Sequence, residues 1–236
     1  MLACAFLPAI AQAAECKTEP VAGGGVTAAR DGRSFVLSDG REVRLAGIEA
    51  GTDGAALAAL IRGQTVTLRV LTRDTDRYGR IIAFAEHDGA SVQEALLRNG
   101  QARVATRTGG LGCAEPLRAA EREARDNKRG LWAQDGALLA TDAPERIAAR
   151  AGHFSVIEGP VLTVREAGSL IYVNFGRRWS RDFTLTILRR NQRLFSSAGI
   201  DLKSLAGKRV RVRGVVELRG GPVIEAEAPE QIEIIQ

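Results

Sequence analysis

The fold is decided by the stretch from Asp31 to Arg80, which contains the segments Asp31-Gly-Arg-Ser-Phe-Val-Leu37, Val43-Arg-Leu-Ala-Gly-Ile-Glu49 and Thr75-Asp-Arg-Tyr-Gly-Arg80. The first two segments lie in a region that alternates apolar and polar residues on both sides of Asp39-Gly40. An Asp-Gly pair between two such runs is a strong signal for a β-hairpin. The alternation returns between Gln64 and Thr72 and resumes after Gly79, so a series of short strands is expected.

Helices and a second β region complete the expected architecture. Helices are expected at 55–61, 91–98 and 115–129, where Ser91 suits an N-cap and Pro116 suits a first turn. A second pattern of short strands begins at His153. The fold class is therefore mainly β with added helices (α+β). The expected domains are 22–134, a linker at 135–152, and a small Greek-key barrel at 153–236.

The charge balance favours an anionic partner. Lys and Arg total 33 against 28 for Asp and Glu, which gives a net charge of +5 and an isoelectric point near 9.5. Most of the cations are arginines, which suit bidentate contacts to phosphate; a coding bias toward arginine would give the same composition. No apolar run reaches the ~20 residues of a membrane span, so none is expected.

The N-terminal residues predict export. Met1 to Ala13 is apolar and ends in Ala11-Gln12-Ala13, a small-x-small pattern typical of a signal-peptide cleavage site. A signal peptide at 1–13 implies a periplasmic or secreted protein of a bacterial envelope. Cleavage would leave Cys16 and Cys113, an even pair in an oxidising compartment, and we expect them to form a disulfide. Two free buried thiols are the alternative.

The order of the motifs over roughly a hundred residues resembles a staphylococcal-type thermonuclease domain. The matching pieces are Asp31-Gly32, Val43-Arg44-Leu45, Asp76-Arg-Tyr-Gly-Arg80, Glu94-Ala-Leu-Leu97 with Gly100, and Ala120-Glu121 to Gly130-Leu131-Trp132. The resemblance implies a five-stranded oligonucleotide-binding (OB) barrel and a calcium-dependent phosphodiesterase ancestry acting on DNA or RNA. The region from His153 resembles a second OB-type barrel found behind such domains in bacterial envelope proteins.

The resemblance also implies site residues. Arg44 and Arg80 match the two arginines that bind phosphate and stabilise developing charge during catalysis; a surface arginine paired with an acid is the alternative. Glu49 falls on an aspartate that binds metal, and Asp31 remains as a second, doubtful ligand for calcium. Arg33 falls on the first metal-binding aspartate, and Thr52 falls on the glutamate that acts as general base, so only a slipped Asp53 could replace it.

A guanidinium at position 33 is unfavourable for calcium binding. At ~4 Å and an effective dielectric constant of ~20, a unit charge opposes a dication by roughly 8 kcal/mol. Even ~3 kcal/mol after screening lowers affinity about a hundredfold. We therefore expect weak calcium binding and impaired hydrolysis. Arg33 would either pair with Glu49 or join Arg44 and Arg80 as a third phosphate contact.

The second domain offers further candidate contacts to nucleic acid. Trp179 and Arg178 combine a ring that can stack on a base with a cation for phosphate. Arg209 and Arg211 alternate with valine along one strand and share a face with Arg213, which predicts a basic stripe. The alternative is that half of the rings in this domain belong to its core and that the arginines are merely solvated.

Three functions are compatible with these residues. The leading hypothesis is an exported protein that binds the phosphodiester backbone, with hydrolysis impaired by the loss of metal ligands. The second is an active, divergent calcium-dependent endonuclease that uses Glu49 and Asp31, with Asp53 as a further candidate. The third is a protein-interaction module of the cell envelope, because such barrels also bind proteins.

Overall fold

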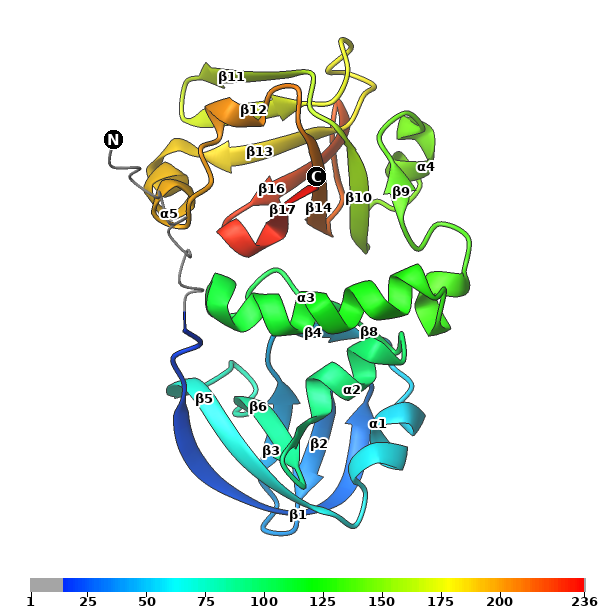
Figure 1. Cartoon of the computed structure of the whole chain (residues 1–236), viewed down its shortest axis with the longest axis vertical. Helices are drawn as coiled ribbons and strands as arrows, with labels where there is room; N and C mark the ends of the chain where they lie inside the picture. The colour runs from blue at the N-terminus through cyan, green and yellow to red at the C-terminus, as the bar shows by residue number, and fades with distance from the viewer. Residues whose placement is uncertain (1–14, 236) are drawn as a thin grey trace, which may run out of the picture.

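Two β lobes lie on either side of the long helix α3 (Leu111–Asp126), which runs between them (Figure 1). The structure is a computed structural model that describes residues 15–235. The predicted signal peptide at 1–13 therefore lies outside the described residues. The fold is mainly β with a few helices, as expected from the sequence.

Five strands of the first lobe close into a barrel. They are β1 (Glu19–Asp31), β2 (Ser34–Leu37), β3 (Glu42–Leu45), β5 (Thr65–Thr75) and β6 (Ile81–His87). Neighbours pair antiparallel in the order β3-β2-β1-β5-β6, and a parallel pairing of β3 with β6 completes the ring. The five-stranded barrel implied by the motifs is confirmed.

The period of two along the strands puts one set of side chains inside the barrel. In β5, Val66, Leu68 and Val70 are buried while the residues between them are exposed, as a strand with one solvated face requires. Phe35 and Val43 fill the interior from β2 and β3. This alternation identified the core face directly from the sequence.

Short helices and strands cover the barrel. They are β4 (Ile48–Ala50), α1 (Ala55–Ile61), β7 (Ala90–Ser91), α2 (Val92–Arg98), β8 (Ala102–Val104) and the 3₁₀ turn η1 (Gly130–Ala133). The hydroxyl of Ser91 accepts a hydrogen bond from the Glu94 backbone N–H at 3.2 Å, which caps α2 as predicted. β4 pairs antiparallel with β8, so the segment carrying Glu49 is fixed beside the barrel.

The second lobe surrounds its own core with two sheets. One sheet has the order β17-β14-β10-β9 and the other β11-β12-β13-β16-β15. Their bounds are β9 (Leu139–Ala140), β10 (Phe154–Pro160), β11 (Thr163–Ala167), β12 (Leu170–Asn174), β13 (Thr184–Leu188), β14 (Arg209–Val215), β15 (Glu217–Arg219), β16 (Gly221–Ala226) and β17 (Ile232–Ile235). The helical pieces are α4 (Pro144–Ala148), η2 (Arg189–Asn191), α5 (Gln192–Ser197), η3 (Lys203–Leu205) and η4 (Pro229–Gln231). Both sheets contribute to one cluster of buried apolar side chains.

The segment 135–152, expected to be a linker, has regular structure of its own. It contains β9, which pairs parallel with β10, and α4, whose Ile147 is fully buried in the core of the second lobe. The small residues before Pro144 suggested a connection, whereas the structure shows a paired strand and a buried helix there. The domain limits of 22–134 and 153–236 stay a prediction.

A disulfide joins the start of the described chain to α3. Cys16 and Cys113 are bonded across a separation of 97 residues, as predicted. The bond fixes the segment before β1 against the helix that lies between the lobes. Among the described residues, no helix combines the length and apolar character needed to cross a membrane.

Removal of the disulfide should lower stability. A cross-link that closes so long a loop restricts the unfolded chain, so the Cys16→Ser/Cys113→Ser variant should lose about 2–4 kcal/mol of unfolding free energy. Urea denaturation of the two proteins measures this loss. Treatment of the parent with a reductant should move its midpoint to that of the variant, and an unchanged midpoint would contradict the prediction.

Candidate phosphate-binding site

The residues predicted from the first three motifs converge at one end of the barrel. Arg44 on β3 pairs in register with Ser34 of β2 on one side and with Ile82 of β6 on the other. Arg33 lies in the turn before β2, and its carbonyl accepts the Leu45 backbone N–H at 2.7 Å. Arg80 lies directly before β6. Three guanidinium groups are thus carried by adjoining strands and turns.

Close backbone contact at Gly32 brings the segment of Glu49 to the same place. The Gly32 N–H donates to the carbonyl of Gly51 at 3.0 Å. A Cβ atom at position 32 would lie 2.7 Å from that oxygen, so only glycine permits the approach. This contact explains the Asp31-Gly32 pair and sets β4 beside the β1–β2 turn.

Arg44 is the cation of this site that has no counter-ion among the described residues. Within residues 15–235 its half-buried guanidinium forms no hydrogen bond or ion pair. Burial lowers the pKa of Arg44, the charges of Arg33 and Arg80 lower it further, and Glu49 and Asp31 oppose this in part. A guanidinium remains charged in any case. It is therefore a strong donor whose donor groups are free for an anion.

Arg80 is held in place by Asp76. The two side chains form a hydrogen bond of 2.8 Å and an ion pair of 2.7 Å, both largely buried. Asp76 also accepts the backbone N–H groups of Tyr78 and Arg80 at 2.9 and 3.1 Å. This arrangement makes the Asp76–Arg80 turn rigid and fixes the Arg80 guanidinium 5.0 Å from the centre of the Tyr78 ring.

The Asp76 carboxyl should titrate at unusually low pH. Burial opposes its ionisation, but the hydrogen bonds from the Arg80 side chain and from the backbone lower the pKa of Asp76 from 3.8 to about 2. The folded-state pKa lies below the unfolded one, so this stabilisation is complete above pH 4 and is lost as pH falls toward 2. Carboxyl titration by NMR should show the low pKa, and Arg80→Gln should raise it toward 3.8. A normal pKa in the parent protein would contradict this geometry.

Arg33 pairs with Glu49, which is one of the two arrangements expected for it. Its guanidinium contacts the Glu49 carboxylate and also donates to the Ile48 carbonyl at 3.0 Å. Both side chains are mostly buried, with exposed fractions of 18% and 31%. The carboxylate that would bind a metal is therefore already neutralised by a cation.

The residues at this end of the barrel do not fit a calcium site. Calcium takes six to eight oxygen ligands, several of them carboxylates. Asp31 accepts the Arg33 backbone N–H at 2.8 Å, and Asp53 accepts the Ala55 N–H at 2.9 Å at the start of α1. Across the part of the chain that the structure describes, no three acidic, histidine or cysteine side chains are grouped to hold a metal.

In the second lobe, the loop candidates are exposed and the expected basic stripe is wrong. Trp179 is 72% exposed, and Arg178 is exposed beside it. Arg211 and Arg213 are buried instead, with exposed fractions of 6% and 0%. Of the three arginines on that strand, Arg209 is the exposed one, and it pairs with Glu158 at 2.8 Å.

Acidic residues on neighbouring strands explain the burial of Arg211. β14 lies between β10 and β17, where Arg211 is in register with Glu158 on one side and Glu233 on the other. It forms ion pairs of 2.7 and 2.9 Å with these two carboxylates. Arg211 is thus unavailable for the backbone contact expected of it. The signal that could have indicated this is the presence of one glutamate on each flanking strand.

Comparison with known proteins identifies relatives of the first lobe. Residues 53–134 match the family model described as Staphylococcal nuclease homologue. The chain is 40% identical over 62 residues to Endonuclease YncB of Bacillus subtilis (strain 168), which is 26% of this chain and 29% of that protein. It is 39% identical over 62 residues to SPbeta prophage-derived endonuclease YokF of the same strain, 26% of this chain and 21% of that protein. The similarity thus spans less than a third of either relative.

Proposed function

We propose that this chain, whose residues 53–134 match the family model described as Staphylococcal nuclease homologue, binds the phosphodiester backbone of nucleic acid at Arg44 and Arg80, with hydrolysis impaired. The observation that carries the proposal is the half-buried Arg44 guanidinium, which has no anionic partner within the described residues, next to an Arg80 fixed by Asp76. Two preorganised guanidinium groups match the oxygens of a phosphodiester.

The Arg33–Glu49 ion pair supports impaired hydrolysis. It places a cation where the resemblance to thermonucleases requires a metal ligand, and Thr52 replaces the general base. Export to the periplasm or the medium is part of the proposal. The Cys16–Cys113 disulfide supports it, because such bonds persist in oxidising compartments.

An active endonuclease is the second candidate function. The similarity to two proteins named as endonucleases favours it, and the activity would then be calcium-dependent. A nuclease assay on plasmid and single-stranded DNA, with calcium or with a chelator, distinguishes the two. Cleavage that the chelator abolishes and that Arg44→Ala lowers would establish the enzyme; we expect no such cleavage.

Binding of nucleic acid should depend on Arg44. We expect Arg44→Ala to weaken the binding of a single-stranded oligonucleotide at least tenfold, because a charge-assisted contact to phosphate is lost. Fluorescence anisotropy at several salt concentrations measures this, and affinity should fall steeply with salt. Arg165→Ala is the matched control. Arg165 is exposed on β11 of the other lobe, and its substitution removes the same charge. Equal losses of affinity in the two variants would show that only net charge matters. If neither the parent nor any variant binds the oligonucleotide, a protein-interaction module is the function that remains.

A further inference from the structure

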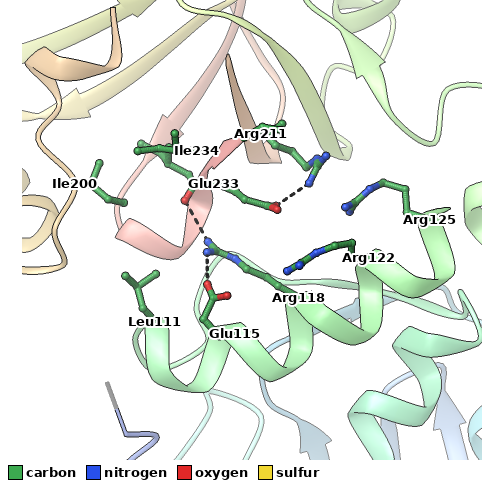
Figure 2. Close-up of a pocket in the computed structure, with 11 residues that line it drawn as sticks. Leu111, Glu115, Arg118, Arg122, Arg125, Ile200, Arg211, Glu233 and Ile234 are labelled. Carbon is green, nitrogen blue, oxygen red and sulfur yellow. Dashed lines mark hydrogen bonds and ion pairs between the residues drawn. The ribbon is translucent and has the colours of Figure 1, made fainter. Parts of the chain in front are cut away.

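A cavity of about 480 Å³ lies between α3 and the β14–β17 edge of the second lobe (Figure 2). Four arginines and two glutamates line it, so two positive charges are in excess. The arginines are Arg118, Arg122 and Arg125 of α3 and Arg211 of β14. The spacing of four and three residues puts the three on one face of the helix, and Figure 2 shows them projecting toward the opposing strands.

Two of these arginines have structural roles. Arg118 donates to the carbonyls of Glu230 and Ile232 at 2.7 and 3.2 Å and to the Glu115 carboxylate at 2.9 Å. Arg211 is bound by its two glutamates. Even so, the Nε atoms of Arg118 and Arg211 are buried without a hydrogen-bond partner in the described chain. Buried donors of this kind normally have one.

The other two arginines have only distant partners, or none, among the described residues. Arg122 is exposed and forms no hydrogen bond or ion pair with any residue in the range 15–235. Arg125 forms no hydrogen bond there either, and its nearest carboxylates, on Glu121 and Asp126, lie 3.7 and 3.9 Å away. Burial lowers the pKa of Arg125, and the nearby charge of Arg211 lowers it further. Within the described residues, Arg122 thus lacks an anionic partner, and the two carboxylates near Arg125 lie at the outer limit of an ion pair.

The other side of the cavity is aliphatic. Leu111, Ile200, Ile234 and Ile235 line it, and Ile234 is 40% exposed. In Figure 2, Leu111, Ile200 and Ile234 lie at the end of the cavity opposite Arg122 and Arg125. A ligand that satisfies both ends must carry an anionic group and an apolar body. None of the described residues that line the cavity has an aromatic ring that could stack on a base.

We propose that this cavity binds a small amphiphile whose oxyanion lies between Arg122 and Arg125 and whose aliphatic part lies against Ile200 and Ile234. Planar guanidinium groups bind phosphate and carboxylate oxygens in pairs. The aliphatic part gains by leaving water. This site shares no residue with the Arg44 site and does not depend on the function proposed for it.

Trp132 provides a direct measurement of binding. Its ring lies 5.7 Å from the Arg125 Cζ atom, so an anion at Arg125 should change its fluorescence. In a Trp179→Phe background, Trp132 is the tryptophan that remains. We expect octyl phosphate and octanoate to give a saturable change. Inorganic phosphate and octanol, which each supply half of the chemistry, should bind at least tenfold more weakly.

Matched variants test the assignment. Arg122→Ala should weaken octyl phosphate about tenfold, and it should fold normally because Arg122 is exposed and unpaired within the described residues. Arg165→Ala and Arg44→Ala should leave octyl phosphate binding unchanged, while Arg122→Ala should leave oligonucleotide binding unchanged. If the parent protein co-sediments with phosphatidic acid vesicles and Arg122→Ala abolishes this, a lipid headgroup supplies the oxyanion. If the protein binds only the soluble probes, the ligand is a free amphiphile. The proposal is overturned if no probe saturates, if octanol binds as well as octyl phosphate, or if Arg122→Ala has no effect.

Discussion

Replacing Glu121 with alanine should destabilise the protein by about 3–5 kcal/mol, because it would remove the closer of the two counter-ions of the buried Arg213, which would keep Glu233 at 3.4 Å. Glu121 of α3 and Arg213 of β14 are 1% and 0% exposed and form an ion pair of 3.1 Å. Arg213 also donates to the Val104 carbonyl at 3.1 Å, while Glu121 accepts the Val104 N–H at 2.7 Å. The pair thus joins β8 of the first lobe to β14 of the second.

Two controls separate burial from charge in this experiment. Glu123 lies on the same helix and pairs with Arg98 and Arg129, but it is 43% exposed, so Glu123→Ala should cost less than 1 kcal/mol. The double variant Glu121→Leu/Arg213→Met removes both charges and should recover much of the loss. Urea denaturation measures all three. A loss below 1 kcal/mol for Glu121→Ala would contradict the prediction, because it would show that Glu233 or water compensates the charge of Arg213.

This ion pair also accounts for the position of α3. Leu117 and Ala120 of the helix belong to the core of the first lobe, while Arg118 and Glu121 bond to β14, η4 and β17 of the second. One helix therefore has an apolar face for one lobe and a charged face for the other. The charged face of α3 is thus in part an interface, and the cavity lined by Arg122 and Arg125 lies along it.

Local patterns in the sequence were sufficient to predict the first lobe. The alternation in β5, the Asp39-Gly40 hairpin and the Ser91 cap each depend on residues close in the chain, and each is present in the structure. The disulfide followed from counting cysteines. The convergence of Arg33, Arg44 and Arg80 followed from motifs that are ordered along one barrel.

Long-range contacts could not be predicted in the same way. A period of two showed that Arg209, Arg211 and Arg213 share a face of one strand, but it does not show what covers that face. Arg213 pairs with Glu121, 92 residues earlier in the chain, and α3 closes over it. Likewise, β9 in the expected linker pairs with β10 through backbone hydrogen bonds. Its two residues are too few to show the alternation of side chains that predicts a strand.

The largest functional effect should come from Arg33→Asp, which we expect to raise calcium affinity at least a hundredfold. The substitution removes the cation that neutralises Glu49 and adds a carboxylate beside it and Asp31. At ~4 Å and an effective dielectric constant of ~20, a unit charge opposes a dication by roughly 8 kcal/mol. If solvent screening leaves only ~3 kcal/mol of this repulsion, its removal raises the calcium affinity about a hundredfold. The new oxygen ligand adds to the gain.

Calorimetric titration with calcium measures this change without relying on activity. Arg33→Ala is the matched control, because it removes the repulsion without supplying a ligand and should give an intermediate affinity. Oligonucleotide binding through Arg44 and Arg80 should persist in both variants, since neither arginine is bonded to Arg33. Micromolar calcium affinity in the parent protein, or no gain in Arg33→Asp, would show that the guanidinium at position 33 does not determine whether this barrel binds a metal.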